Sequence, residues 1–227
     1  RVWGSLGDGG TQPSNLDVVS SISSSYRAFA ALTEHGTVVA WGNPQYGGGM
    51  TDVTINGVVY TGVPAGLKDV QALYSTRGAF AALVKDGTVQ VWGDPSNGGK
   101  LTSSSDLKGV QSIFNSYRAF AALKGDGTIF SWGEPLDGGS MTNGRDATFG
   151  SYTGVPSGLK NVKTIFSYCQ YFADSTAAEL LPCPHNTYGP GFPDCTACPQ
   201  GSKQPVGRPG IRSKVWSCIE YADEYEW

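Results

Sequence analysis

The sequence has few charged residues and no long apolar run. Lys, Arg, Asp and Glu make up 15% of its 227 residues, against roughly 25% in an average soluble domain. The net charge is −3, and Lys and Arg never cluster, which argues against the basic surface that nucleic-acid binding normally needs. No stretch approaches the ~18 consecutive apolar residues of a membrane-spanning helix. We therefore expect neither a nucleic-acid partner nor a membrane span.

Residues that carry out catalysis or bind metals are also scarce. The two histidines are His35 and His185, and their spacing indicates no Ser–His–Asp set. His35 stands at the turn position that Asp86 and Asp126 hold in later repeats, so we interpret it as a turn residue. The acidic residues of the glycine-rich turns lack the regular spacing of calcium ligands. They are Asp8, Asp94 and Asp137. The sequence thus predicts no enzyme activity, cofactor or metal site.

Glycine, by contrast, is abundant. It accounts for 32 of the 227 residues, about twice the usual share of roughly 7%. Glycine and β-branched residues both lower helix propensity, whereas serine, threonine and aromatic residues are typical of short strands between tight turns. The composition therefore predicts an all-β fold.

A repeated motif dominates the sequence up to about residue 172. Three complete copies align without gaps over residues 22–48, 73–99 and 113–139. Each copy has an Ala-Phe-Ala-Ala-Leu segment, then Gly-Thr, then Trp-Gly, and it ends in Gly-Gly. Residues 2–10 carry only the end of the motif, and residues 162–172 carry only its beginning.

Each copy is predicted to form three strands. In the second copy these are 70–74, 79–83 and 89–92, with a two-residue hairpin turn at Asp86-Gly87, because this pair supplies the positive φ angles that such a turn needs. A fourth strand could come from the longer connections between copies. Since one copy cannot bury both faces of its sheet, we expect its aromatic residues to pack between neighbouring copies. These residues are Trp3, Trp41, Trp92, Trp132, Phe29, Phe80, Phe120 and Phe172.

The motif Gly-Leu-x-x-Val-x-x-Ile, Ala-Phe-Ala-Ala-Leu and Asp-Gly-Thr-Val-x-x-Trp-Gly resembles the RCC1-like repeats (regulator of chromosome condensation type). It is similar above all to divergent versions from large algal and protist proteins. The resemblance implies β-propeller blades of four strands, normally seven to a closed ring. Three complete copies and two end pieces are too few for that ring, so we expect propeller-like blades or an open stacked array. The family's nucleotide-exchange and ubiquitin-ligase roles are not carried over.

The end of the sequence, from Cys183 on, is rich in cysteine, proline and glycine. It resembles the short ephrin-receptor-like modules of extracellular proteins, and the resemblance implies the disulfides Cys183–Cys195 and Cys198–Cys218. Such a small module cannot form an adequate hydrophobic core and needs covalent links, each worth about 2–4 kcal/mol. The alternative is a zinc site, in which Cys195 and Cys198 bind together with Cys183, His185 or Cys218.

The predicted organisation is a repeat domain at 1–173, a linker at 174–182 and a disulfide module at 183–227. The fifth cysteine, Cys169, lies in the last partial copy, where tyrosine stands in two earlier copies. It is either a buried free thiol or a cysteine that bonds to another chain or to the cysteine-rich tail.

The incomplete ends of the repeat array predict self-assembly. Val2, Trp3 and Gly4 form the kind of strand that is missing after Phe172. Within one chain this strand would close a ring; between chains it would join copies head to tail, and a joint of that kind that does not close makes a filament. We favour the joint between chains, and expect an extracellular structural protein whose partners are copies of itself. The alternative is an extracellular binding module whose Tyr-Arg loops recognise a glycan or another protein.

Overall fold

The computed structural model describes residues 2–11, 13–14, 16–101, 107–148, 150–168 and 171–176, and four two-residue strands beyond them. Those strands are β16 (Thr187–Tyr188), β17 (Thr196–Ala197), β18 (Ser202–Lys203) and β19 (Ile219–Glu220). The described residues contain short antiparallel sheets and no α-helix, which confirms the all-β prediction. None of the described helical turns has the length and apolar character needed to cross a membrane.

Each complete repeat forms one three-stranded antiparallel sheet. The first sheet consists of β1 (Val19–Ser24), β2 (Ala28–Thr33) and β3 (Val38–Gly42). The second consists of β6 (Val70–Ser75), β7 (Ala79–Val84) and β8 (Val89–Gly93). The third consists of β9 (Val110–Asn115), β10 (Ala119–Lys124) and β11 (Ile129–Gly133). The last partial repeat has two described strands, β14 (Val162–Tyr168) and β15 (Tyr171–Thr176).

The longer connections form small hairpins. They are β4 (Val53–Ile55) with β5 (Val58–Tyr60), and β12 (Gly144–Asp146) with β13 (Gly150–Tyr152). The residue after β5, Thr61, forms an isolated bridge with Gly93 at the end of β8. The first connection thus reaches the edge of the next sheet, although it adds a single bridge rather than the full fourth strand that we considered.

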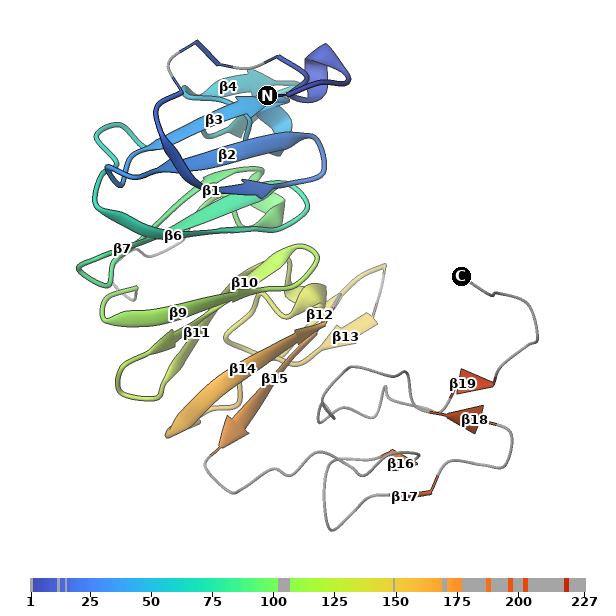
Figure 1. Cartoon of the computed structure of the whole chain (residues 1–227). Helices are drawn as coiled ribbons and strands as arrows, with labels where there is room; N and C mark the ends of the chain where they lie inside the picture. The colour runs from blue at the N-terminus through green and yellow to red at the C-terminus, as the bar shows by residue number, and fades with distance from the viewer. Residues whose placement is uncertain are drawn as a thin grey trace.

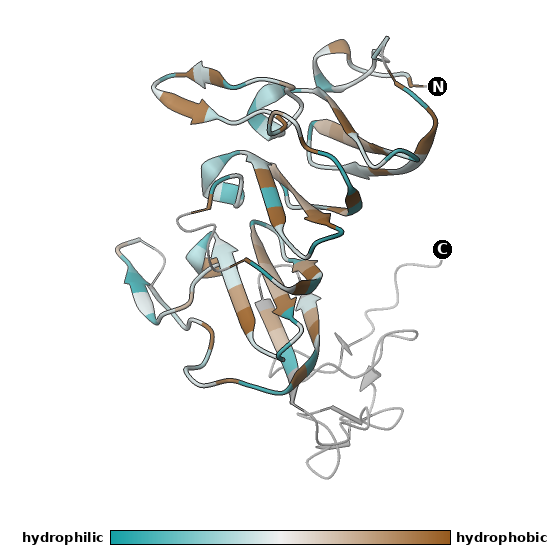
Figure 2. Cartoon of the chain, turned by 90° about the vertical axis from the view of Figure 1, so that its left-hand side faces the viewer, coloured by the Kyte–Doolittle hydropathy of each residue, from teal (hydrophilic) through white to brown (hydrophobic). Residues whose placement is uncertain are grey.

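The sheets stack in sequence order, from the first sheet near the N-terminus to β14 and β15 at the opposite end (Figure 1). Backbone hydrogen bonds join consecutive repeats. Val70 N–H donates to the carbonyl of Gly36 at 3.0 Å, and Val110 N–H donates to that of Gly87 at 2.9 Å. Figure 2 shows the hydrophobic residues concentrated on the strands of this stack.

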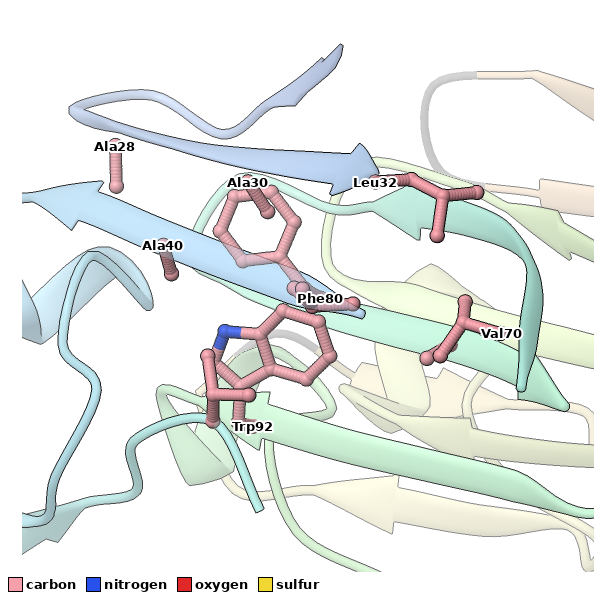
Figure 3. Packing of buried hydrophobic residues seen from close by; sticks show 10 residues of the cluster. Ala28, Ala30, Leu32, Ala40, Val70, Phe80 and Trp92 are labelled. Atoms are coloured by element: carbon pink, nitrogen blue, oxygen red, sulfur yellow. The ribbon is translucent and has the colours of Figure 1, made fainter. Parts of the chain in front are cut away.

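The core lies between consecutive sheets rather than within one. The central strand of each repeat is buried on both faces; in β7, Ala79, Phe80, Ala81 and Ala82 are fully buried. Figure 3 shows Phe80 and Trp92 of the second repeat packed with alanines of the first, in one cluster of buried residues. Alanine suits this strand because its small side chain lets the neighbouring sheets approach closely on both sides.

The hairpin turn of each repeat differs from the predicted two-residue type. In the second repeat, Val84 N–H bonds to Thr88 carbonyl oxygen, which leaves a three-residue loop in which Gly87 has a φ of 80°. Asp86 keeps an ordinary negative φ because its carboxylate accepts bonds from the Thr88 hydroxyl at 2.7 Å and from the Thr88 N–H at 2.9 Å. These bonds hold the pKa of Asp86 below its usual value.

The same turn in the third repeat, with Asp126 and Thr128, also lowers the pKa of its carboxyl group. A carboxyl group whose pKa is lowered by folding stabilises the folded state at pH values above its unfolded-state pKa of about 3.9. This stabilisation is lost as the pH falls through the folded-state pKa. We expect urea unfolding between pH 6 and pH 2 to show a larger loss of stability in the wild type than in the Asp86→Asn/Asp126→Asn variant. Equal losses in both proteins would contradict this role of the turns.

Candidate functional site at the incomplete last repeat

Each complete repeat closes on the preceding one through a phenylalanine, a tryptophan and a glycine. In the second repeat the rings of Phe80 and Trp92 stack with centroids 5.4 Å apart and planes inclined by 20°. The indole Nε1–H of Trp92 donates to the carbonyl oxygen of Gly47 at 3.0 Å. Gly47 ends the preceding repeat with a φ of 85°, and a Cβ atom on it would lie 2.6 Å from the Phe80 ring. We call this arrangement the Phe–Trp–Gly junction.

The first and third repeats have the same junction. Its members are Gly9, Phe29 and Trp41 in the first repeat, and Gly98, Phe120 and Trp132 in the third. The ring centroids are 5.4 and 5.1 Å apart, and the indole donates to the glycine carbonyl at 3.1 Å in both cases. Since Gly9 belongs to the N-terminal piece at 2–10, that piece supplies the turn on which the first repeat closes.

Most of the aromatic residues expected between repeats lie there. Phe80 and Phe120 are fully buried, Phe29 and Phe172 are partly buried, and Trp41, Trp92 and Trp132 expose at most 7% of their surface. Trp3 is the exception, because 86% of its surface is exposed. Among the described residues, the indoles that donate to a glycine carbonyl are those of Trp41, Trp92 and Trp132, and the packing of Trp3 between repeats stays a prediction.

The last repeat has the phenylalanine and the glycine of the junction, but no tryptophan. Phe172 lies against Gly138, where a Cβ atom would approach its ring to 2.7 Å. Among the described strands β15 has one neighbour, β14, so the place of the third strand is open. The Gly138 carbonyl accepts a bond from the hydroxyl of Ser131, where the other junctions use an indole N–H.

A cavity of about 1000 Å³ lies at this position. Its walls include five residues whose counterparts, at the junction of the first and second repeats, lie in the core cluster of Trp92 or accept its indole hydrogen bond. The five are Ala121, Ser131, Gly138, Val155 and Phe172, which align with Ala30, Ala40, Gly47, Val63 and Phe80. The cavity is therefore the space that a third strand with its tryptophan fills in the complete repeats. We call it the tryptophan socket.

The socket is more polar than its filled counterparts. Ser131 stands where the first repeat has alanine, and Asp174 of β15 stands where β7 has Ala82. At its wall Arg118 Nε donates to Asp137 Oδ2 at 2.8 Å, and Asp137 is fully buried.

A second feature runs along one edge of the stack, where aromatic and cationic side chains alternate. The guanidinium carbon of Arg77 lies 5.2 Å from the ring centroid of Tyr26 and 5.6 Å from that of Tyr117, in the repeats on either side. Both tyrosines are exposed, with 67% and 47% of their surface accessible. The Tyr-Arg loops considered for the alternative binding module are thus linked across repeats, because Arg77 stands at the position of both tyrosines.

Arg27 and two other residues considered in the sequence analysis, His35 and Asp94, make separate contacts. Arg27 forms an ion pair with Asp8 at 2.7 Å, and its hydrogen bond holds the pKa of Asp8 below the usual value. His35 is exposed in its turn, 3.5 Å from Asp17. Asp94 accepts a bond from Ser96 N–H at the start of a short 3-10 turn.

No group of three or more potential metal ligands occurs among the described residues. The predicted disulfides and the alternative zinc site lie outside those residues and stay predictions. The residues concerned are Cys169, Cys183, His185, Cys195, Cys198 and Cys218.

Stacked small antiparallel sheets, each completed by a turn from its neighbour, define a tandem β-repeat protein of the propeller type. Residues 19–47 match the family described as regulator of chromosome condensation (RCC1) repeat. Prp20p of Saccharomyces cerevisiae has a similar structure, with 17% identity over 91% of this chain and 52% of its own, at a TM-score of 0.50. Yeast RCC1 (Prp20) bound to Kap60 matches with 16% identity over 92% of this chain and 50% of its own, at a TM-score of 0.48. No curated protein matches the sequence.

The family match and the similarity to Prp20p place the described repeats in the RCC1-like fold, and the predicted resemblance of the repeats is confirmed. The chain spans about half the length of Prp20p, 52%. Its described strands form no closed ring.

The Phe–Trp–Gly junction predicts different costs for two glycine substitutions. Gly47 and Gly66 both have positive φ, 85° and 75°, but only Gly47 faces a ring, since a Cβ on Gly66 would meet nothing within 4 Å. We expect Gly66→Ala to cost about 1 kcal/mol of backbone strain, and Gly47→Ala roughly 1–3 kcal/mol more, because the methyl group displaces Phe80. Urea unfolding measures both values, and equal costs would show that the close approach is unimportant.

Proposed function

We propose that this chain is a non-catalytic protein-interaction module, whose partner completes the last repeat by adding a strand that contains Trp-Gly. The tryptophan socket is the observation that supports the proposal. It has the residues that surround Trp92 in the second repeat, and it lies beside a strand edge with one neighbour among the described strands. Addition of a strand to an open sheet edge is a common mode of protein recognition, in which backbone bonds give affinity and side-chain pockets give specificity.

The internal junctions indicate the contacts that such a strand would make. Its indole would stack on Phe172 and donate to the Gly138 carbonyl, as Trp92 does with Phe80 and Gly47. Burying an indole removes on the order of 150–250 Å² from water, at roughly 25 cal/mol per Å². This apolar contribution of several kcal/mol is the main source of affinity that we propose.

The glycine after the tryptophan would also find a partner. In the second repeat Gly93 N–H donates to the Thr61 carbonyl at 2.9 Å, and Thr61 N–H donates to the Gly93 carbonyl at 3.2 Å. Thr153 aligns with Thr61 and lines the socket. A Trp-Gly pair therefore matches the site better than a tryptophan alone.

A protein partner and an extracellular setting are parts of the same proposal. The structurally similar Prp20p is described by its binding to Gsp1p and histones, so binding to proteins is in keeping with the fold. The cysteine-rich segment from Cys183 on resembles extracellular modules, and this resemblance supports a location outside the cell. There the chain would serve as a structural subunit of a surface fibre or sheath rather than as an enzyme.

The row of Tyr26, Arg77 and Tyr117 supports a second candidate function. Exposed aromatic rings with a cation between them offer flat faces and hydrogen-bond donors, which suit a glycan or a protein loop. In this alternative the partner binds along the edge of the stack and leaves the socket empty.

A peptide experiment tests the proposed function. A fluorescent peptide with the sequence of residues 89–99, which contains Trp92 and Gly93, is titrated into the Trp3→Ala chain and followed by anisotropy. We expect saturable binding, and at least about tenfold weaker binding by the same peptide with alanine for tryptophan, because tenfold corresponds to only 1.4 kcal/mol.

Two variants serve as controls for the site. Phe172→Ala should weaken peptide binding, whereas Tyr26→Ala should leave it unchanged. Equal binding of the two peptides, or no binding of either, would refute the proposed strand site. Loss of binding in the Tyr26→Ala variant alone would favour the tyrosine–arginine row.

A further inference from the structure

We infer that the strand that enters the tryptophan socket is Val2-Trp3-Gly4 of a second copy of this chain. The inference rests on the proposed function and names the partner of that site. It joins two unusual features of the molecule, an exposed tryptophan at one end of the stack and, at the other, a tryptophan site that no described tryptophan occupies.

The N-terminal piece already has the conformation of a strand end and its turn. Residues 2–10 align with 91–99 without a gap, from Val-Trp-Gly to Gly-Gly. Gly4 has a φ of 121°, close to the 108° of Gly93. Gly10 packs against the carbonyl of Gly4 as Gly99 does against that of Gly93. The turn that follows Trp3 is thus formed before any partner binds, and no folding cost arises there.

Trp3 is presented by this turn without being buried. Its exposed fraction is 86%, whereas the other tryptophans of the junctions expose at most 7%. The N-terminus and β15 lie at opposite ends of the stack (Figure 1). Trp3 therefore cannot reach the socket of its own chain without unstacking the repeats, so its socket would have to belong to a second copy.

The strand register of the complete repeats predicts the contacts of the joint. Phe29 pairs with Trp41, Phe80 with Trp92 and Phe120 with Trp132 in antiparallel register. The same register places Trp3 opposite Phe172 and Val2 opposite Ala173. The Trp3 indole N–H would then replace the Ser131 hydroxyl as the hydrogen-bond donor to the Gly138 carbonyl.

Charge complementarity supports this register. Asp174 of β15 stands where the complete repeats have alanine, and it lines the socket. Arg1 precedes Val2 in the sequence, so the antiparallel register, continued by one residue, would pair this position of the second copy with Asp174. Opposite charges at directly paired positions of neighbouring strands stabilise the pairing. Of the four repeats, only the last carries an acidic residue at this position, and the segment proposed to pair with it begins with a cation.

The proposed contact between two chains would have the same arrangement as the Phe–Trp–Gly junctions within one chain. The turn at 4–10 would keep its contact with Phe29 and Trp41 of its own chain while Trp3 enters the neighbour. Such a contact is head to tail, so it makes a ring if the rotation closes and a filament if it does not.

Light scattering of the 227-residue chain tests the inference. We expect the mass to rise from the monomer value of 23.9 kDa to at least twice that value with increasing concentration. Trp3→Ala should stay monomeric, whereas Val59→Ser, which removes an apolar side chain with 46% exposure on the β4–β5 hairpin, should assemble as the wild type does. A monomeric wild type, or assembly of the Trp3→Ala variant, would overturn the inference.

A charge exchange tests the register itself. We expect Asp174→Arg and Arg1→Asp each to weaken association at least about tenfold, and the double variant to recover most of it. Failure of the double variant to assemble better than either single variant would overturn the register. A mixture of Val2→Cys and Ala173→Cys chains should form a mixed disulfide between these two positions, mapped by mass spectrometry, while Val2→Cys with Val59→Cys should not.

The peptide experiment separates this inference from the proposed function. If the Trp3→Ala chain binds the 89–99 peptide while the wild type stays monomeric, the socket takes a strand from another protein and only the inference fails. If neither peptide binding nor assembly occurs, the proposed function fails as well.

Discussion

The contact between a Phe–Trp pair and the glycine turn of the preceding repeat is the interaction on which the rest of the structure depends. Only glycine lets the turn lie on the ring, because it has no Cβ and accepts a positive φ. The glycine carbonyl would be buried without a partner at this position, and a buried unpaired polar group is costly. The indole N–H satisfies it. Each sheet is therefore completed by residues of its neighbour, and stability is shared between adjacent repeats, as in other repeat proteins.

Much of the fold could be predicted from the sequence, because the repeats align without gaps. The three strands of each repeat, the hairpin that joins the second to the third, and the burial of Trp41, Trp92 and Trp132 are predictable from matching the copies. The turn type did not, since the bonds from Thr88 to Asp86 favour a three-residue loop that the Asp-Gly pair does not reveal. The row around Arg77 is not predictable from the Tyr-Arg pairs within one repeat, because its stacking runs across repeats.

The candidate site could be predicted only in outline. The sequence indicated that a strand is missing after Phe172, but it did not indicate a socket lined by Gly138 and Val155, because these walls come from a turn and a connection that are distant in sequence. Nor did the sequence indicate the exposure of Trp3, which depends on whether the glycine carbonyl of an adjacent turn accepts a hydrogen bond from its indole. The polar replacements at Ser131 and Asp174 are visible in the sequence, but their meaning depends on knowing that both face the same cavity.

The turn at 4–10 supports the first sheet and also carries Trp3, so the order of the sheet and the binding of Trp3 are coupled. On one side it is the seat of Phe29 and Trp41; on the other it carries Trp3. Whatever immobilises Trp3 also immobilises the support of the first sheet, so fraying of that sheet and release of the indole are thermodynamically linked. In the proposed assembly, the first sheet would thus gain rigidity from the molecule that binds Trp3.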